Sequence, residues 1–595
     1  MRNHVISYWP LIVVFAAVFA LKLYLALIDP VLHAADPWLW ALVVERLAQG
    51  SLIEQLSMIR SAPSFFSIAV YPKAYPLLAA LIAVATGTSG YEVVRFYPVV
   101  SAFNLIPMYF LSLFVSKSRR VAAVSIVLVS ISRWYAIRTS IGNPECFTHF
   151  WLIFSLLFLL RLRYTPTWRN MAASIFFMTM SAMFWYLPVA IYAVFLPLLC
   201  IVNLRNTPYF TKLILVVILS GFFAGVLWYF YTPNPFGAIV FIYTVVDKGL
   251  RSSFFTSQNI LSSFMPLLVK HWGYILPILG VSGFVYTLAH RQLRRNPSSI
   301  FLTVYSASII ILIFMSLIIG EGKYDTGVTY LFSSATFPLS IFAAIALMKS
   351  VDKIETVTRS HNFKSVISSG SHNWIRRRST QILSISILIL VVVGNLNVLN
   401  YGGNHYFALT LNDLTFQGSE TVSGNVVSPW IVTFQYDKWP DSPSKEVYDA
   451  LRWIRDNTGK QACVIAFLTP PPPVPPLPPF LTPSPDVSGG VLRKAFSVIS
   501  ERSFLEGIGF NSTLMNSPTA FREAALNASN GTDVYIVIGV RSWQGEDRAY
   551  PHLESQFLYY ADQTPDLFPQ VYSAKGVHVF CITGNPRCVN ISIQN

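Results

Sequence analysis

The chain contains 595 residues, of which 53% are hydrophobic and 12% charged, and its mean hydropathy is +0.51. Soluble domains carry about a quarter charged residues, so this composition excludes an ordinary soluble protein. The formal net charge of +15 could attract nucleic acid. The positions of the basic residues, described below, instead favour a membrane protein that binds no nucleic acid.

The apolar residues form long runs, as in residues 12–28 and 309–320. A membrane span needs about 20 mostly apolar residues, and we identify about eleven such segments. They begin near residues 8, 96, 121, 148, 170, 188, 212, 270, 299, 329 and 381. No small-residue cleavage site follows the first, so we interpret it as a span rather than a secretory signal. The sequence predicts a polytopic α-helical membrane protein with about 11–13 spans.

Basic residues recur in every second short loop between these segments. They lie at Lys117–Arg120, Arg161–Arg169, Arg205–Lys212, Arg291–Arg295 and Lys349–Arg378. Because cytoplasmic loops are enriched in Lys and Arg, we expect a multi-pass cell-membrane protein with a cytoplasmic N-terminus and an external C-terminus. The glycosylation sequons at Asn511, Asn527, Asn530 and Asn590 all follow the last segment. Cys581 and Cys588 are spaced for a short disulfide loop, which an external compartment permits.

Three predicted external segments are candidates for function: residues 29–95, 138–147 and 232–265. The first contains an apolar stretch, residues 75–87, that is short for a span. We interpret this stretch as an interfacial or re-entrant helix, because a crossing here would move every later basic loop to the external side.

The last third of the chain is less apolar, and we expect a membrane domain over residues 1–400 and an external domain over residues 401–595. The pattern of residues 444–459 predicts an amphipathic helix that Ser444 caps. Strand patterns follow at residues 462–468, 534–540 and 571–582, which together predict a mixed α/β domain. Residues 470–485 contain ten prolines, so we expect an extended loop there.

Acidic residues are scarce, and three of them lie in predicted external turns beside spans. Asp36 follows the first span, Glu145 precedes the fourth, and Asp247 lies in the 232–265 segment. An unpaired carboxylate near the membrane is costly. Three carboxylates converging at one interface would suit Mg²⁺ or Mn²⁺ with a phosphate partner. Such an ion could neutralise the charge that develops on a lipid pyrophosphate leaving group.

In this order and spacing, the motifs resemble the catalytic subunit of oligosaccharyltransferase, whose architecture is called GT-C. Asp36–Trp38 resembles the family's aspartate-proline-tryptophan motif, and Arg138–Gly142 followed by Glu145 resembles its arginine-threonine-x-x-glycine turn. Thr244–Asp247 resembles a third motif, which begins with threonine or serine and ends in an acid. The helix at residues 75–87 and the external C-terminal domain also occur at the same places along the chain as in this family.

The resemblance implies a metal-dependent, inverting transfer of a glycan from a polyprenyl or dolichyl (pyro)phosphate carrier to protein asparagine. Asp36, Glu145 and Asp247 would be the catalytic residues and would hold Mg²⁺ or Mn²⁺. Asp36 and Asp247 would also engage the acceptor amide. The implied partners are a lipid-linked glycan donor, an acceptor protein or other glycan acceptor, and membrane lipids.

The chain departs from the family at several positions. Phe147 stands where the family has the second acid of the turn. Tyr330 stands where the family has a late arginine that contacts the lipid phosphate, and Lys323 is the nearest external cation. Arg138, Tyr330 and Lys323 are therefore the candidate substrate-binding residues. The tryptophan-tryptophan-aspartate motif, which reads the sequon, is replaced by Leu468–Pro470 and the proline tract.

Structural alternatives remain open for each candidate. Asp36 could cap a helix with proline at its first position. Glu145 could be an acid at a helix N-terminus that is there only because the helix dipole favours it. Asp247 could be a solvated loop residue, and Arg138 could anchor a span at the headgroups. His149, one turn after Glu145, is either a packed polar residue or a further ligand.

Alternatives also remain open for the function. One is a GT-C transferase that uses a lipid-phosphate monosaccharide on a glycan or lipid acceptor. Another is a paralogue without activity. A transporter would carry charges at mid-span and paired interrupted helices, whereas the acids of this chain lie at the external edge.

Overall fold

The structure is a computed structural model of the chain. It describes residues 2–28, 35–49, 74–132, 135, 139, 142–185, 187–204, 206–231, 275–319, 326–360, 397–400, 405–409, 426–428, 431–435, 445–459, 461–467, 500, 502–506, 517–539, 551–574 and 576–582.

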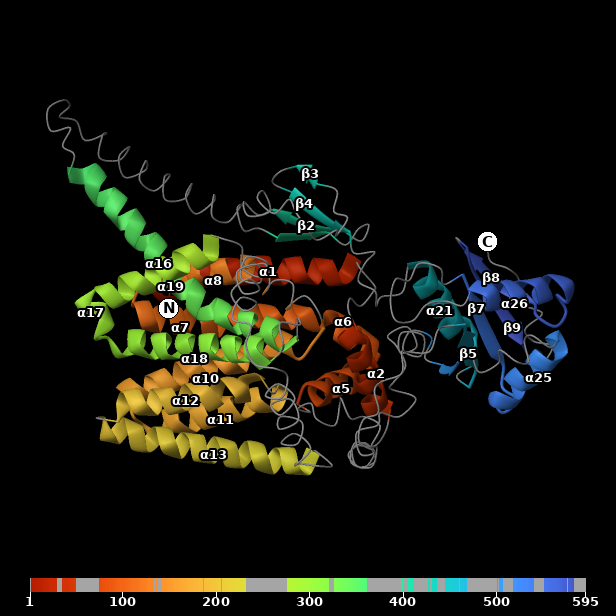
Figure 1. The fold of residues 1–595 in the computed structure, drawn as a ribbon, viewed down its shortest axis with the longest axis horizontal. Coiled ribbons are helices and arrows are strands. Elements are labelled where there is room, and N and C mark those ends of the chain that lie inside the picture. The colour runs from red at the N-terminus through yellow and green to blue at the C-terminus, as the bar shows by residue number, and fades with distance from the viewer. Residues whose placement is uncertain are drawn as a thin grey trace.

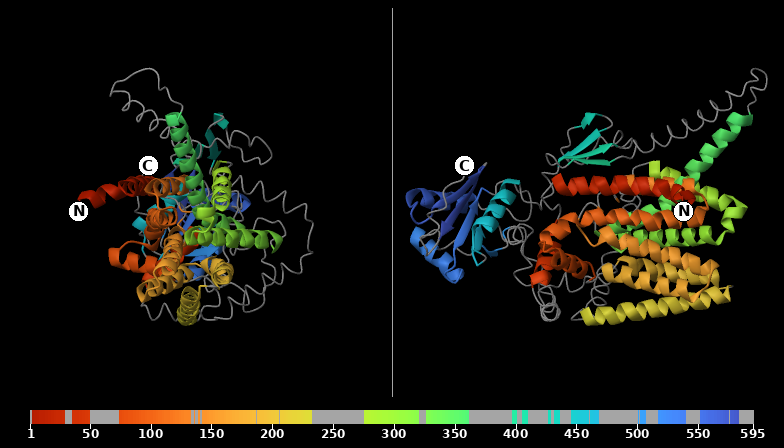
Figure 2. Two further views of the ribbon diagram at one scale, coloured as in Figure 1. Left: turned by 90° about the vertical axis from the view of Figure 1, so that its left-hand side faces the viewer. Right: turned by 180° about the vertical axis from the view of Figure 1, so that it is seen from behind.

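The N-terminal part is a bundle of mostly apolar helices, most of which lie roughly parallel to one another (Figures 1 and 2). Its helices are α1 (Arg2–Ile28), α6 (Gly90–Val100), the 3₁₀ turn η1 (Ser101–Asn104), α7 (Leu105–Ser116), α8 (Arg119–Ile131), α10 (Glu145–Tyr164), α11 (Trp168–Phe184), α12 (Leu187–Asn203), α13 (Thr207–Tyr231), α16 (Ile275–Ala289), α17 (Arg291–Arg294), α18 (Pro297–Ile319) and α19 (Thr326–Ser360). Each predicted span up to residue 360 coincides with an apolar helix. The one predicted near residue 381 lies outside the described residues, so the total number of spans stays a prediction.

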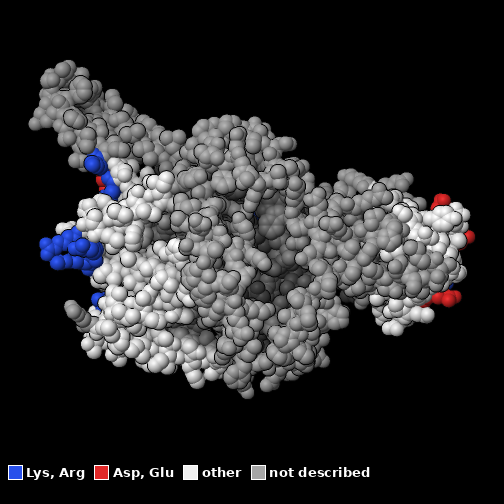
Figure 3. Space-filling model, viewed as in Figure 1, with Lys and Arg blue, Asp and Glu red and all other residues white. Residues whose placement is uncertain are grey.

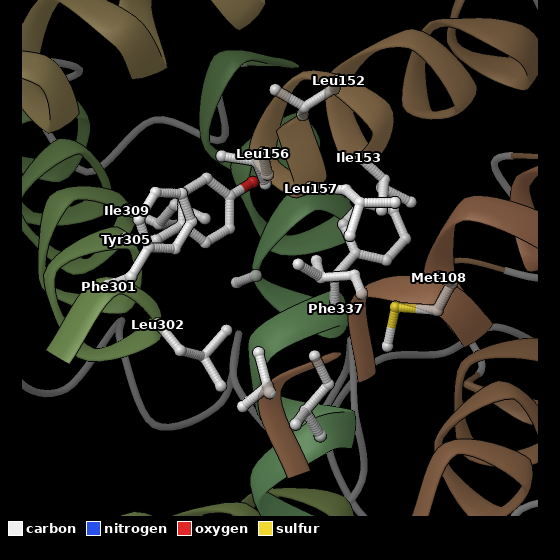
Figure 4. Close-up of a cluster of buried hydrophobic side chains, with 14 of the residues drawn as sticks. Met108, Leu152, Ile153, Leu156, Leu157, Phe301, Leu302, Tyr305, Ile309 and Phe337 are labelled. Carbon is white, nitrogen blue, oxygen red and sulfur yellow. The ribbon is translucent and has the colours of Figure 1, made fainter. Parts of the chain in front are cut away.

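Within the described residues, 5 continuous helices are long and apolar enough to cross a membrane: Gly90–Ser116, Glu145–Tyr164, Thr207–Leu227, Pro297–Met315 and Leu331–Lys353. The bundle interior is filled by apolar side chains from several of these helices, including Met108, Leu156, Phe301 and Phe337 (Figure 4). The outer helix α13 instead exposes Ile218 and Phe222 by 60% and 61%. An apolar surface of this kind is stable against lipid, and the predicted polytopic helical membrane fold is confirmed.

Two glycines let α16 approach α19 closely. A Cβ atom on Gly283 would lie 1.8 Å from the backbone oxygen of Phe342, and one on Gly280 would lie 2.2 Å from a methyl carbon of Leu339. Small residues at such contacts allow membrane helices to pack backbone against backbone. The position of α19, which contributes to the candidate site, is fixed in this way.

Among the residues that the structure describes, Lys and Arg gather at the end of the bundle that carries α17 (Figure 3). The C-terminal strands lie at the opposite end, beside α2 (Ala35–Gln49), α5 (Ala74–Thr86) and α6 (Figures 1 and 2). Helix α5 covers the stretch predicted to be interfacial or re-entrant and has only 13 residues, whereas a span needs about 20.

The C-terminal part contains a five-stranded mixed sheet in the order β6-β5-β7-β9-β8. Its strands are β5 (Cys463–Ala466), β6 (Ser503–Glu506), β7 (Val534–Ile538), β8 (Gln570–Ala574) and β9 (Val577–Ile582). The helices α21 (Lys445–Asn457), α25 (Pro518–Ala528) and α26 (Pro551–Gln563) accompany it. Strand β5 is parallel to β6 and β7, whereas β9 is antiparallel to both of its neighbours.

The predicted helix and the first two predicted strands coincide with α21, β5 and β7. The single strand predicted over residues 571–582 is wrong, because β8 and β9 form a hairpin there. The chain reverses at Gly576, whose φ of +85° is accessible to glycine but unfavourable for other residues. Cys581 is disulfide-bonded, whereas Cys588 and the proline tract 470–485 lie outside the described residues.

A second sheet, which the sequence patterns do not predict, is antiparallel. It contains β1 (Asn397–Asn400), β2 (His405–Leu409), β3 (Val426–Ser428) and β4 (Ile431–Gln435) in the order β1-β2-β4-β3. The proposed boundary near residue 400 would fall just after β1.

The end of α21 is stabilised by a buried arginine. Arg502 is 5% exposed and donates hydrogen bonds from Nη2 to the carbonyl oxygens of Arg455 and Thr458 at 2.8 and 2.7 Å. Its Nε donates to Thr458 Oγ1 at 3.1 Å. A cation at this position satisfies carbonyl groups that the end of a helix leaves unpaired.

Candidate functional site

Glu145 is the first residue of α10. Pro144 is the N-cap residue, and its φ of −50° suits the start of a helix. The amide of Cys146 donates to the carbonyl oxygen of Asn143 at 3.0 Å, and the amide of Thr148 donates to that of Pro144 at 3.1 Å. Glu145 therefore lies in the first turn, where the helix dipole stabilises a negative charge. Its side chain is 1% exposed.

The carboxylate of Glu145 meets polar groups from its own helix and from α19. Ser333 Oγ donates a hydrogen bond of 2.6 Å to Glu145 Oε1. His149 Nε2 lies 3.9 Å from the same oxygen and 3.4 Å from Ser333 Oγ. Ser333 and His149 are fully buried. The imidazole also packs against the rings of Tyr135 and Phe337, at centroid distances of 5.9 and 4.9 Å. We call Glu145, His149 and Ser333 the α10–α19 polar cluster.

The turn before α10 is held at Thr139 by a side chain from α1. Lys22 Nζ, from α1, donates to the carbonyl oxygen of Thr139 at 2.9 Å and to its Oγ1 at 3.0 Å. Ser101 Oγ, from η1, lies 3.2 Å from the same carbonyl oxygen, although its proton is donated to the carbonyl oxygen of Pro98 at 2.6 Å. The Thr139 hydroxyl in turn donates to the carbonyl oxygen of Tyr135 at 2.7 Å.

The same turn is held at Gly142 and Cys146. Tyr75 Oη, from α5, donates to the carbonyl oxygen of Gly142 at 2.8 Å. A Cβ atom on Gly142 would lie 2.5 Å from the backbone oxygen of Val94, so only glycine fits against α6 here. Asn104 Nδ2 donates to the carbonyl oxygen of Cys146 at 2.8 Å. These contacts place Glu145 at the end of the bundle where α2, α5 and the C-terminal strands lie.

Of the three predicted catalytic and metal-binding carboxylates, the structure describes only the side chain of Glu145. Asp36 lies in the first turn of α2, but its side chain is outside the described part. Asp247 lies wholly outside it. Within the described part, no group of three or more His, Cys, Asp and Glu residues could hold a metal ion. The convergence of the three carboxylates therefore stays a prediction.

The predicted substrate-binding residues are also untested. Tyr330 lies in α19, with its side chain outside the described part, and Arg138 and Lys323 are outside it entirely. Phe147, at the position of the family's second acid, is described. It packs against Phe150, Trp151 and Phe184, at centroid distances of 4.8, 5.4 and 5.8 Å, and so belongs to an aromatic cluster.

Two residues of this region were not among the sequence candidates. Ser333 belongs to the polar run Ser333–Ser334 and Thr336 within an apolar span, and Lys22 is a cation within the first apolar run. Polar residues in a span usually face the bundle interior. This rule would have marked both residues as inward-facing, although it does not identify their partners.

No protein-family model matches the chain, and no curated protein matches its sequence. Among solved structures, ArnT from Cupriavidus metallidurans bound to undecaprenyl phosphate superposes with a TM-score of 0.50, at 11% identity, over 96% of this chain and 98% of ArnT. An oligosaccharyltransferase from Archaeoglobus fulgidus in complex with Zn and sulfate gives a TM-score of 0.47, at 15% identity, over 95% of this chain and 72% of that protein. The mycobacterial arabinofuranosyltransferase AftD gives 0.43, at 12% identity, over 97% of this chain and 40% of AftD.

The chain is an integral membrane protein with a GT-C-like fold. Within this fold, Glu145 offers a carboxylate, the ligand type that Mg²⁺ and Mn²⁺ prefer. The hydroxyl of Ser333 and the first turn of α10 stabilise that carboxylate. One carboxylate alone does not make a site for either ion, so a metal site here would need ligands beyond the described part.

Proposed function

We propose that this protein is a membrane glycosyltransferase that takes its sugar from a polyprenyl or dolichyl phosphate carrier. The observation that carries the proposal is the buried carboxylate of Glu145 in a GT-C-like fold. It lies at the start of a span, after a turn that side chains from α1, α5 and η1 hold in place. The fold is similar to that of ArnT, a protein solved with undecaprenyl phosphate bound. A preorganised carboxylate at a membrane surface is suited to stabilising charge during transfer from a lipid phosphate.

We further propose that Asp36 and Asp247 join Glu145 to hold Mg²⁺ or Mn²⁺, with Arg138, Tyr330 and Lys323 beside the lipid phosphate. The bound ion would neutralise negative charge on the phosphate that leaves. Asp36 and Asp247 would orient the acceptor, and Glu145 would keep its geometry because α10, α19 and the turn before it fix its position.

We propose that the end of the bundle that carries Glu145 and the C-terminal strands lies outside the cytoplasm. The gathering of Lys and Arg at the opposite end supports this orientation (Figure 3). The disulfide at Cys581 also supports it, since disulfides persist in oxidising compartments.

Two acceptors are in competition. Transfer of an oligosaccharide to protein asparagine is supported by the order of the three acidic motifs. Transfer of a monosaccharide from a lipid phosphate to a glycan or lipid is supported by a different observation. The strand β5 leads into the proline tract, where the oligosaccharyltransferase family has its sequon-reading tryptophan-tryptophan-aspartate motif.

The test is a transfer assay with the full-length protein in lipid nanodiscs and Mn²⁺. One arm offers a polyprenyl-pyrophosphate oligosaccharide with an Asn-x-Thr peptide, and the other offers a polyprenyl-phosphate monosaccharide with a lipid-linked glycan. We expect transfer in one arm, lost on chelation and in Glu145→Gln. The matched control is Glu92→Gln, which also changes an acid in the first turn of a helix but one that pairs with Arg95. Equal activity of Glu145→Gln and Glu92→Gln, or no transfer in either arm, would reject the proposed function.

A further inference from the structure

Lys22 occupies an unusual position for a lysine in a membrane helix. Only Lys22 and Arg502 are buried among the lysine and arginine side chains that the structure describes. The neighbours of Lys22 on α1, Leu21 and Tyr24, are 45% and 58% exposed, whereas Lys22 is 8% exposed. Its side chain therefore points into the bundle while its neighbours face outward.

A membrane lysine near a helix end normally extends its side chain toward water. Lys22 is six residues from the end of α1 at Ile28, which is roughly 9 Å along the helix. Burial of the ammonium group in this bundle needs compensation, because an isolated buried charge is strongly unfavourable. Thr139 provides it with two oxygen acceptors, at 2.9 and 3.0 Å.

The geometry at Thr139 requires the lysine to be the donor. The Thr139 hydroxyl already donates to Tyr135, so its oxygen can only accept from Lys22 Nζ. The carbonyl oxygen of Thr139 accepts from Lys22 Nζ at 2.9 Å and, more weakly, from the thiol of Cys146 at 3.6 Å. The orientation of this peptide unit is thus set mainly from α1, across 117 residues of sequence.

We propose that Lys22 is a positioning residue: its ammonium group fixes the turn at Thr139 and thereby holds Glu145 in place for the reaction. Thr139 lies six residues before Glu145, and Cys146 Sγ, directly after Glu145, contacts the Thr139 carbonyl oxygen at 3.6 Å. Loss of the ammonium group frees that carbonyl and loosens the start of α10. The inference rests on the proposed function only for the reaction that Glu145 serves.

The first measurement does not depend on activity. Cys146 is fully buried, so its labelling by N-ethylmaleimide, quantified by mass spectrometry, reports opening of the turn. Lys22→Met is expected to raise the labelling rate by at least about tenfold, since a hydrogen bond to a charged group is lost from a buried site. Lys22→Arg, which keeps the charge and the donors, should restore most of the protection. The matched control is Leu21→Met on the outward face of α1, which should label at the wild-type rate.

Labelling of Lys22→Met at the wild-type rate, or equal labelling of the Met and Arg variants, would overturn the inference. If Lys22→Met does not fold, Thr139→Val tests the same contact, because it removes the hydroxyl acceptor and keeps the carbonyl. Its labelling rate should rise by a smaller factor, and an unchanged rate would also overturn the inference.

The second measurement separates positioning from binding in the transfer assay. Lys22→Met should lower kcat and leave KM for the donor nearly unchanged, since the residue acts through the turn and Glu145. A rise in KM with unchanged kcat would contradict this role. Faster labelling of Lys22→Met in a protein without any transfer activity would reject the proposed function and leave the structural inference standing.

Discussion

The hydrogen bond between Ser333 and Glu145 allows a quantitative test of the α10–α19 polar cluster. Ser333→Ala removes a donor 2.6 Å from a fully buried carboxylate oxygen. Hydrogen bonds between neutral groups in membrane proteins contribute about 0.6 kcal/mol on average and at most about 1.7. Hydrogen bonds to charged groups contribute about 1.5–3 kcal/mol. If Glu145 is ionised, Ser333→Ala should therefore lower the free energy of unfolding by about 2 kcal/mol.

The neighbouring serine provides the control. Ser334 is as buried as Ser333, but its hydroxyl has no hydrogen-bond partner among the residues that the structure describes. Ser334→Ala removes the same atoms from the same helix, so it should be neutral or stabilising, because an unsatisfied buried hydroxyl is itself unfavourable.

The assay is reversible unfolding in mixed micelles with increasing sodium dodecyl sulfate, followed by circular dichroism. A combination with Glu145→Gln gives the coupling energy between the two side chains. A loss of about 0.6 kcal/mol for Ser333→Ala would indicate a neutral Glu145. Equal losses for Ser333→Ala and Ser334→Ala would refute the assignment of the hydrogen bond.

Two further predictions concern the framework. Gly283→Ala should lower the free energy of unfolding by about 1–3 kcal/mol, because the added methyl group would overlap the backbone of Phe342. Gly221→Ala on α13 meets nothing within 4 Å and should be near neutral in the same unfolding assay; equal effects would contradict the close packing of α16 on α19. Arg502→Met should lower the stability of the C-terminal part by about 3 kcal/mol, since the substitution leaves carbonyl groups at the end of α21 without a donor. Limited proteolysis between α21 and β5 measures this loss. Unchanged protection from the protease would contradict the proposed role of Arg502.

The sequence predicts the helices well because each span needs a long apolar run, a local property. It also predicts that Glu145 stands at the start of a helix, where the helix dipole favours an acid, and α10 begins at this residue. The partners of Glu145 could not be predicted. Ser333 is 188 residues away and Lys22 is 117 residues from Thr139, and no periodicity connects such positions. The strands β1–β4 were missed, whereas the equally short β5 and β7 were predicted because each of these two is an uninterrupted apolar run.

One cluster of buried apolar side chains joins helices of the membrane part to the C-terminal helix α21 and strands, and this affects how the protein is made. Tyr91 of α6 meets Tyr448 of α21 at a centroid distance of 6.1 Å, within one cluster of buried side chains that also includes Val94 and Val579. Ribosomes synthesise α6 hundreds of residues before β9. During that interval the face of α6 that Tyr91 occupies lacks its contact with α21, so a nascent protein halted before residue 445 would leave Tyr91 without this packing and accessible to chaperones and other membrane proteins.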